Sequence, residues 1–357
     1  MLLKTPIMLA ALALAGGAAA LAQGTPPARN ANQAGNAADA EHGRWAPPGT
    51  PGSPIDGTIF HAQVLLDVAG FPAGVIDGKK GMSFKKAVQG FQQSRGLKES
   101  GELDTPTRQA LLAVGRQSTR NLALGPEVFE GTFINPLPKK PEAQAKLDFL
   151  GYRNPLEKLA EMFHTTPDTI VALNGPDKQL VEGAVLRLPN VLPSSRAYGG
   201  RLKADYAKWF SLLNVDANQP SGDHVVVDKS EGVLKVLDKA DKLIAQFPVT
   251  MGSTHDPLPL GRWKAVTYAF LPPFHYQPDL FWDVSDEKEE QKLPPGPNGM
   301  VGVAWLDLTK EHYGIHGTPE PRFIGKSESH GCLRMTNWDV MRLSRMMKPG
   351  FQAKFLA

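Results

Sequence analysis

The sequence predicts a multi-domain protein in which a mainly β C-terminal unit follows two small helix-containing units. Short β-branched runs with turn residues between them begin near Gly222. Apolar residues recur at helical spacing in two earlier stretches, 54–115 and 151–192. The chain of 357 residues is longer than one hydrophobic core normally serves, and its 31 prolines and 35 glycines indicate linkers and many turns.

The first 22 residues have the order of a secretory signal peptide. Lys4 precedes an apolar run from Ile7 to Ala15, and Ala20-Leu21-Ala22 has the small-x-small pattern of a cleavage site. The apolar run is short for a bilayer span, although an uncleaved anchor stays open as an alternative. Residues 23–53 are rich in Ala, Asn, Gly and Pro, which predicts a disordered linker. We therefore expect an exported protein of the periplasm or cell wall, with no stable membrane insertion after signal cleavage.

The charge balance excludes some partners. A formal net charge of +3 is small for this length, so it favours neither nucleic-acid binding nor strong attraction to a membrane. The hydrophobic fraction of 41% is ordinary for folded domains.

Residues 54–115 are predicted to form three helices. Phe60 and Val64 begin the first stripe, Ser83 is a plausible N-cap of the second helix, and Asp104 is the expected N-cap of the third. The stretch resembles the small peptidoglycan-binding domain found beside many cell-wall enzymes. The resemblance rests on Gln63, Leu66, Gly70, Asp77-Gly78, Ala87-Val88, Phe91-Gln92, Gly96-Leu97, Gly101, Leu103-Asp104 and Thr107. This resemblance implies peptidoglycan binding.

A second small unit is predicted at 151–192, between linkers at 116–150 and 193–221. It should contain two helices, the second starting at Pro167, and a short strand at 185–189. Its pattern resembles a lysin motif, a glycan-binding module, although the usual opening strand is poorly marked. The resemblance rests on Leu159 to His164, Leu173-Asn174, Gly183 and Leu188-Pro189-Asn190. We interpret His164 as a helix-surface residue.

Residues 222–357 are predicted to form the mainly β unit. Runs at 224–228, 233–237 and 243–249 indicate strands, which return at 302–306 and 313–316. The stretches 252–261 and 271–299 are expected to be long loops, the second covering a cleft. A helix from Trp338 to Met347, capped by Asn337, should precede a last strand at 353–356.

Cys332 is the single cysteine of the chain. A lone thiol in an exported protein cannot form an intramolecular disulfide, and this one lies in the polar stretch Ser329-His330-Gly331-Cys332. We interpret it as a nucleophile that needs a basic neighbour. His330, two residues away, and His316, at a predicted strand end, are both candidates. The N–H groups of Gly331 and Cys332 could stabilise an oxyanion.

The segments His316-Gly317-Thr318 and Ser329 to Arg334 resemble the active-site signature of the L,D-transpeptidases of bacterial cell walls. The resemblance implies a β-sandwich-type catalytic domain over 222–357. It also implies that Cys332 is the acyl-accepting nucleophile, that His316 is the general base, and that the Gly317 carbonyl holds its ring. The resemblance further implies that a set of nearby residues forms the pocket and the oxyanion hole and contacts the substrate: His330, Gly331, Ser329, Tyr313 and Arg334. The chain departs from the family at Leu258-Pro259-Leu260-Gly261 and Asn298 to Gly302, which leaves loop shape and substrate preference open.

The resemblance implies a murein L,D-transpeptidase in peptidoglycan biosynthesis, cell-wall biogenesis and cell shape. Its thiol would attack the bond before a terminal D-alanine and pass the acyl group to a stem amine, giving 3-3 cross-links. Transfer to water would make a carboxypeptidase and transfer to a D-amino acid an exchanger, and the sequence does not choose among these. No cofactor or metal is expected. The other open interpretations are an inert buried cysteine, a zinc site at His316, His330 and Cys332, and a non-catalytic peptidoglycan-binding scaffold.

Overall fold

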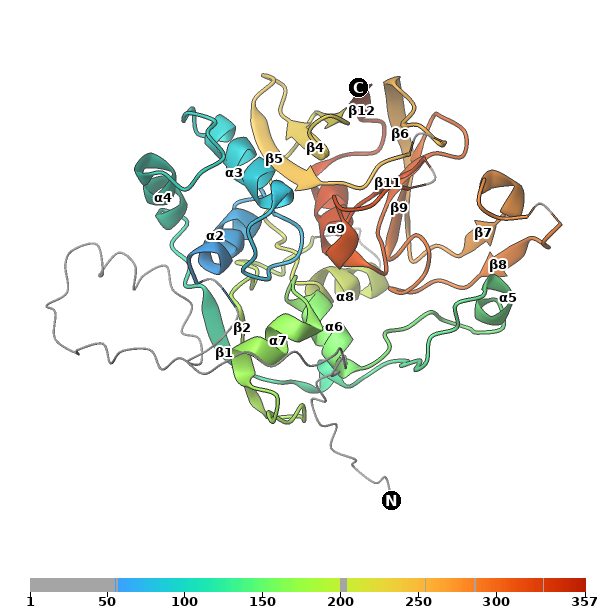
Figure 1. Cartoon of the computed structure of the whole chain (residues 1–357), viewed down its shortest axis with the longest axis horizontal. Coiled ribbons are helices and arrows are strands. Elements are labelled where there is room, and N and C mark those ends of the chain that lie inside the picture. Colours follow the sequence, from blue (N-terminus) through green and yellow to red (C-terminus); the bar gives the residue numbers. More distant parts are fainter. Residues whose placement is uncertain (1–54, 56, 200–203, 254, 286, 330) are drawn as a thin grey trace, which may run out of the picture.

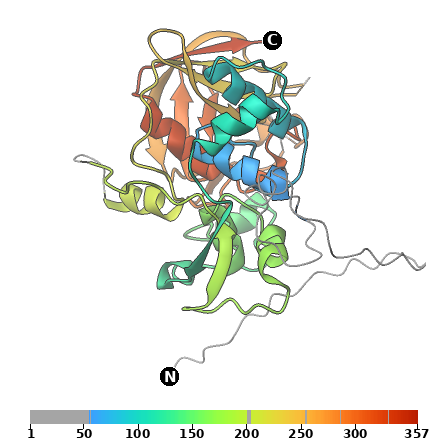
Figure 2. The same cartoon turned by 90° about the vertical axis from the view of Figure 1, so that its left-hand side faces the viewer.

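The computed structural model describes residues 55, 57–199, 204–253, 255–285, 287–329 and 331–357. The predicted signal peptide, the linker at 23–53 and His330 therefore lie outside the described residues. Three units follow one another along the chain: a helical unit, a small unit of two strands and two helices, and a larger unit built on an eight-stranded sheet. The helical unit (blue) lies beside the sheet, and the small unit (green) lies below both (Figures 1 and 2).

The helical unit contains α2 (Gly57–Val68), α3 (Met82–Ser94) and α4 (Thr105–Leu112), whose apolar faces share one core. Asp104 caps α4 as predicted, because its side chain accepts a hydrogen bond from the N–H of Thr107. The prediction of Ser83 as the N-cap is wrong, because α3 already begins at Met82 and Gly81 occupies the N-cap position.

The second unit consists of two paired strands with two helices between them in the sequence. Its elements are β1 (Thr119–Ala123), α6 (Pro155–Met162), α7 (Pro167–Asn174) and β2 (Val185–Pro189). The strands are antiparallel, with Thr119 opposite Pro189. The stretch 116–150, for which the sequence predicts a linker, thus contains β1, together with η1 (Pro126–Val128) and α5 (Pro141–Gln144). The order of the unit is strand, helix, helix, strand, and we call it the β1–β2 unit.

The third unit is a single sheet with the strand order β11-β10-β9-β6-β12-β3-β4-β5. Its strands are β3 (His224–Asp228), β4 (Val233–Leu237), β5 (Leu243–Pro248), β6 (Gly261–Phe270), β9 (Ala304–Leu308), β10 (Gly314–His316), β11 (Leu333–Arg334) and β12 (Gln352–Leu356). Just beyond β5, Thr250 exchanges two backbone hydrogen bonds with Arg334 of β11, at 3.0 and 2.9 Å. The sheet therefore curls until its opposite edges meet. This confirms the prediction of a mainly β unit, with one curled sheet in place of two separate sheets.

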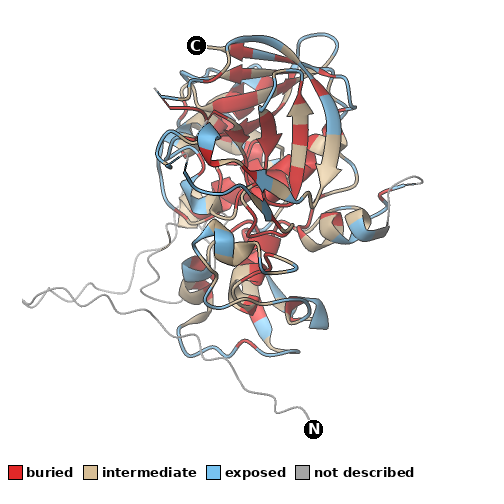
Figure 3. Ribbon diagram, turned by 90° about the vertical axis from the view of Figure 1, so that its right-hand side faces the viewer, coloured by how far each residue is buried: buried red, intermediate tan, exposed pale blue. Residues whose placement is uncertain are grey.

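One helix near the C-terminus, α9 (Asn337–Met346), packs against β9 and β10. Trp338 is fully buried there, in the same core as Phe210 of α8 (Ala204–Leu212), a helix within the predicted linker at 193–221. Thr336 caps α9 by accepting from the N–H of Asp339, so the prediction of Asn337 as the cap is wrong by one residue. The Asn337 side chain is thereby available for other contacts. Buried residues concentrate in the sheet and around α9 (Figure 3).

The stretch 271–299 is less irregular than predicted. It holds the hairpin of β7 (Phe274–Tyr276) and β8 (Gln291–Leu293), with the 3-10 turn η2 (Pro278–Leu280) between them. Beyond η2, the ring of Trp282 stacks on His255 of the other long loop, at 4.2 Å between centroids. Coverage of a cleft by this stretch stays a prediction. Within the described ranges, no helix combines the length and the apolar character needed to cross a bilayer.

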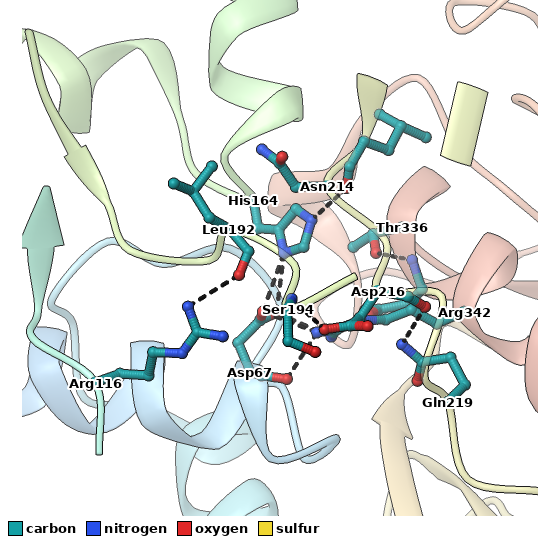
Figure 4. A network of polar contacts seen from close by, with 12 residues as sticks. Asp67, Arg116, His164, Leu192, Ser194, Asn214, Asp216, Gln219, Thr336 and Arg342 are labelled. Atoms are coloured by element: carbon teal, nitrogen blue, oxygen red, sulfur yellow. Dashed lines mark hydrogen bonds and ion pairs between the residues drawn. The ribbon is translucent and has the colours of Figure 1, made fainter. Parts of the chain in front are cut away.

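The three units meet at a buried polar junction (Figure 4). Asp67 of α2 contacts Nδ1 of His164 at 3.1 Å and the guanidinium of Arg342 at 3.1 Å. The other His164 ring nitrogen contacts the carbonyl of Leu213 at 2.8 Å, and the ring stacks on Trp338. His164 is 0% exposed, so its interpretation as a surface residue is wrong. The burial arises because segments far apart in the sequence close over the ring.

The helical unit also covers the edge strand β5. The Gln246 N–H donates to the carbonyl of Gly70 at 3.0 Å, and its side-chain amide donates to the carbonyl of Lys86 at 2.8 Å. α3 packs along β5, and the two bonds join the helical unit to the sheet.

Candidate active site

The thiol and the imidazole singled out by the sequence come from neighbouring parallel strands. β10 ends at His316, β11 begins one residue after Cys332, and His316 lies opposite Arg334 in the register. Extending the register by one residue beyond the pair of Ile315 and Leu333 sets Cys332 opposite Gly314. Residues that are directly opposite or two apart share one face of a sheet. Cys332, His316 and Arg334 therefore project from the same face.

An aromatic wall covers one side of the imidazole. Trp305 of β9 lies directly opposite His316, and the two rings stack with centroids 5.3 Å apart and planes 16° apart. Gly314 leaves space for the indole, since a Cβ there would lie 2.4 Å from a ring atom of Trp305. His316 is consequently only 4% exposed.

His316 is placed to act as a neutral base. Its Nδ1 lies 2.7 Å from the carbonyl oxygen of Gly317, which can only accept, so Nδ1 carries the proton and Nε2 has the free lone pair. Burial lowers the pKa of His316 to about 3, and the nearby charge of Arg334 acts in the same direction, whereas the Gly317 carbonyl opposes it. The imidazole is therefore uncharged at neutral pH.

Cys332 is partly buried, and its thiol is also uncharged at neutral pH. Burial raises the pKa of Cys332, while a hydrogen bond from the Gly314 backbone and the charge of Arg334 partly oppose this effect. The Sγ atom lies 3.6 Å from the carbonyl oxygen of His312, which the S–H can approach as a weak donor. The resting pair is a thiol and a neutral imidazole, which differs from a preformed thiolate–imidazolium pair.

Arg334 is a cation without a counter-ion in the described part of the chain. Its Nε is buried and has no hydrogen-bond partner there, and no described carboxylate forms an ion pair with it. Burial lowers the pKa of Arg334, and the charge of Cys332 in its thiolate form raises it. A partly buried guanidinium of this kind is suited to bind a carboxylate of a ligand.

The segment before the thiol is held by hydrogen bonds. Ser329 donates from its hydroxyl to the carbonyl of Cys332 at 2.6 Å, and its N–H donates to Met251 at 2.9 Å. Gly331 has φ of 104°, a conformation that favours glycine, and a Cβ there would lie 2.9 Å from the ring of Tyr313. Tyr313 thus borders the thiol segment. Use of the Gly331 and Cys332 N–H groups as an oxyanion hole stays a prediction.

The side chain of Asn337 contacts the backbone next to His316, and sequence reasoning assigned this residue no functional role. Its Oδ1 accepts from the N–H of Val303 at 3.1 Å. The same atom occupies the place that a Cβ would take at Gly317, 2.1 Å away, or at Gly302, 2.0 Å away. The amide therefore lies against the backbone whose carbonyl holds His316. The one feature of the sequence that pointed to Asn337 was a polar residue at the start of a predicted helix.

Of the predicted site residues, His330 lies outside the described residues, and the others gather around the end of β10 and the start of β11. These are Tyr313, His316, Gly317, Ser329, Gly331, Cys332 and Arg334. In the described chain, no group of three or more His, Cys, Asp or Glu side chains is placed to hold a metal ion. The zinc interpretation includes His330 and stays open.

Comparisons with known proteins agree with two of the three resemblances. Residues 222–354 match the YkuD family model, described as the L,D-transpeptidase catalytic domain, and residues 58–111 match a model described as "Putative peptidoglycan binding domain". An L,D-transpeptidase catalytic domain and a peptidoglycan-binding domain are thus found in the chain. The lysin-motif resemblance of the β1–β2 unit stays a prediction.

Two curated relatives carry the name "Putative L,D-transpeptidase YkuD". The protein of Bacillus licheniformis is 32% identical over 114 residues, which cover 32% of this chain and 54% of the relative. The protein of Bacillus subtilis is 52% identical over 54 residues, which cover 15% of this chain and 33% of the relative. The chain thus spans about half or less of the length of these two relatives. A solved L,D-transpeptidase of Xylanimonas cellulosilytica is 14% identical with a TM-score of 0.34, over 93% of this chain and 100% of that one.

Proposed function

We propose that this chain is a peptidoglycan L,D-transpeptidase with Cys332 as its nucleophile and His316 as its general base. The observation that carries the proposal is the shared sheet face of these two residues, with Nδ1 of His316 committed to Gly317. The free Nε2 is then the nitrogen that can accept the thiol proton. General-base assistance of this kind contributes about 10²–10⁴-fold to a rate.

In the acylation step, the sulfur of Cys332 attacks the carbonyl carbon that precedes the terminal D-alanine of a stem tetrapeptide. The thiol proton passes to His316 as the C–S bond forms. The C–N bond then breaks, and His316 returns the proton to the departing amine, so that free D-alanine leaves. A thioester on Cys332 remains. Because thiol and imidazole both start uncharged, proton transfer and attack are coupled.

In the second step, an amine of a neighbouring stem attacks the thioester carbonyl. The C–N bond forms, the C–S bond breaks, and the amine proton passes through His316 to the sulfur, which regenerates the thiol. The product is a 3-3 cross-link between two third residues. Water in place of the amine gives a carboxypeptidase reaction, and a D-amino acid gives exchange.

The groups around the thiol have distinct proposed tasks. Arg334 binds a carboxylate of the stem peptide, because its charge is partly buried and forms no ion pair in the described chain. Tyr313 and Ser329 shape the wall of the site, and the N–H groups of Gly331 and Cys332 receive the developing oxyanion. His330 belongs to this set by sequence alone.

The other units are proposed to hold the substrate polymer. The helical unit would bind peptidoglycan, as the description of its matched model suggests. The β1–β2 unit has the strand, helix, helix, strand order and would bind glycan strands as a lysin motif does. This proposal agrees with export to the periplasm or cell wall, where peptidoglycan is found.

The test is incubation of the chain, without its predicted signal peptide, with a defined disaccharide-tetrapeptide, followed by mass analysis of products and of the intact protein. We expect D-alanine release, a covalent adduct on Cys332 and cross-linked dimers. Cys332→Ser is the matched control, because it replaces the thiol with a hydroxyl of similar size, which is a much weaker nucleophile, and it should yield none of these. Release of D-alanine by that variant, or no adduct on the wild-type chain, would refute the proposal.

A further inference from the structure

A hydrogen bond connects the β1–β2 unit to the back of the proposed active site. Glu161, on α6, accepts from the side-chain amide of Asn337 at 2.8 Å, and the two residues are 176 positions apart. The same amide group donates to the carbonyl of Pro297 at 3.1 Å. Glu161 lies outside the segment 222–354 that matches the catalytic-domain model. The segment that matches the catalytic-domain model is therefore contacted, at a buried position, by a residue of the β1–β2 unit.

The orientation of the Asn337 amide is fixed by its partners. The Pro297 carbonyl can only accept, so the NH₂ group must face it, and the Val303 N–H can only donate, so Oδ1 must face that. With Glu161 as the second acceptor, three hydrogen bonds hold the amide in a site where Asn337 is 0% exposed. Loss of one of them would leave a buried donor unpaired, which costs about 1–3 kcal/mol.

The held amide touches the backbone that carries the proposed base. Oδ1 of Asn337 fills the space next to the Cα of Gly317, where a Cβ would lie only 2.1 Å from it. The carbonyl of Gly317 in turn lies 2.7 Å from Nδ1 of His316. A continuous series of contacts thus runs from Glu161 through Asn337 and Gly317 to the imidazole.

Glu161 is itself held in place. The hydroxyl of Tyr152 hydrogen-bonds its second oxygen, and Glu161 forms no ion pair within the described ranges. Burial raises the pKa of Glu161 to about 8, while the bonds from Tyr152 and Asn337 oppose the rise. At neutral pH the group is mostly a neutral acid, and its oxygen still accepts from Asn337. A glutamine would reproduce this acceptor.

We propose that Glu161 is a positioning residue: acting through Asn337 and Gly317, it sets the orientation of the His316 ring, so that the base is correctly aimed only while the β1–β2 unit is docked. The part that concerns catalysis rests on the proposed function, because it takes His316 as the base. A displacement of about 1 Å at a reacting group can cost about 10²-fold in rate. A contact this remote can therefore matter for the reaction.

The experiment compares Glu161→Ala with Glu161→Gln in the full chain. The first readout is NMR of ¹⁵N-labelled histidine side chains, with the His316 signal assigned through His316→Gln. We expect Glu161→Ala to disturb the Nδ1–H signal of His316 and to move its pKa toward the ordinary value of about 6.5. Glu161→Gln should restore the wild-type signal. This readout needs no turnover, so it reports on the contact even where the proposed function fails.

The second readout is the kinetics of D-alanine release. Glu161→Ala should lower kcat by about 10–100-fold with little change in KM, and Glu161→Gln should stay within about threefold of wild type. Gln246→Ala is the matched control, because it removes a contact between the helical unit and the sheet and involves neither the β1–β2 unit nor Gly317. Gln246→Ala should lower stability and leave the His316 signal unchanged. The proposal is overturned if Glu161→Ala leaves the signal unchanged, or if Gln246→Ala disturbs it equally.

Discussion

The indole of Trp305 and the imidazole of His316 are stacked, with ring centroids 5.3 Å apart. They come from directly opposite positions of β9 and β10, so the antiparallel register itself sets this contact. The stack excludes water from one side of the imidazole, and burial is the largest cause of its low pKa. The character of His316 as an uncharged base is thus built into the sheet.

Gly314→Ala should break this arrangement. The new Cβ would lie 2.4 Å from the Trp305 ring, so the indole must move away from His316. We expect acylation of Cys332 by a penem or a tetrapeptide to slow by about 10-fold or more, with the fold retained. Stopped-flow fluorescence measures the rate of acylation, and circular dichroism measures whether the fold is retained. Gly81→Ala, where a Cβ meets nothing within 4 Å, is the control, and an equal loss in both variants would contradict the argument.

The pH dependence of alkylation tests the resting state of the thiol. Since burial holds the pKa of Cys332 above its ordinary value, the fraction of thiolate at pH 7 is below that of a free cysteine. We expect the rate of modification by iodoacetamide to keep rising beyond pH 9. Cys332 is the single cysteine of the chain, so intact mass gives the rate directly. A plateau below pH 7 would indicate a thiolate–imidazolium pair instead.

His316 should make the protein sensitive to acid. Its pKa is about 3 in the folded chain and about 6.5 in the unfolded chain, so the unfolded state binds more protons between these values. The free energy of unfolding must therefore fall as pH falls from 6.5 toward 3, by on the order of 4–5 kcal/mol at most. Urea unfolding of the wild-type chain and of His316→Gln at pH 7 and pH 4 isolates this contribution. An equal loss of unfolding free energy in both proteins would contradict a role of His316.

Asp67→Asn should destabilise the chain strongly. It removes the carboxylate that faces Arg342 and His164 at the buried junction, and the buried guanidinium then loses a charged partner. We expect a loss of about 3–5 kcal/mol in the free energy of unfolding, measured by urea denaturation. Glu102→Gln, which removes an exposed ion pair with Lys80, should leave that free energy nearly unchanged. Similar unfolding midpoints for the two variants would show that the junction is not stabilising.

Arg334→Gln should impair recognition of an anionic substrate. A charged hydrogen bond contributes about 1.5–3 kcal/mol, so we expect kcat/KM for an acidic tetrapeptide to fall by about 10–100-fold. Comparison with a tetrapeptide amidated at its C-terminus shows whether the terminal carboxylate is the one bound. An unchanged kcat/KM for the acidic peptide would exclude Arg334 as its partner.

Local patterns predicted much of the fold. β3 alternates buried and partly buried positions, as its β-branched run implies, and Asp104 caps its helix through a contact three residues away. The residues around Cys332 predict a nucleophile with His316 or His330 as its partner, and the resemblance to L,D-transpeptidases implies His316. The register of His316 and Cys332 on parallel strands fits that identification.

Features that depend on distant partners could not be predicted. β1 has little strand pattern of its own, and its partner β2 begins more than sixty residues later in the sequence. His164 is buried because Asp67 and Trp338 reach it from opposite ends of the described chain. Asn337 lies one residue after the true cap, and only the folded structure shows that its amide supports Gly317.

The covering of β5 by the helical unit has a practical consequence. An outer strand stripped of its neighbour offers unpaired amides and carbonyls to the same strand of another molecule. A protein shortened to residues 222–357 would lose α3 and the Gly70 carbonyl that now satisfies Gln246. Such a fragment would associate edge to edge and lose solubility, so the helical unit also protects the sheet from pairing with other copies of the chain.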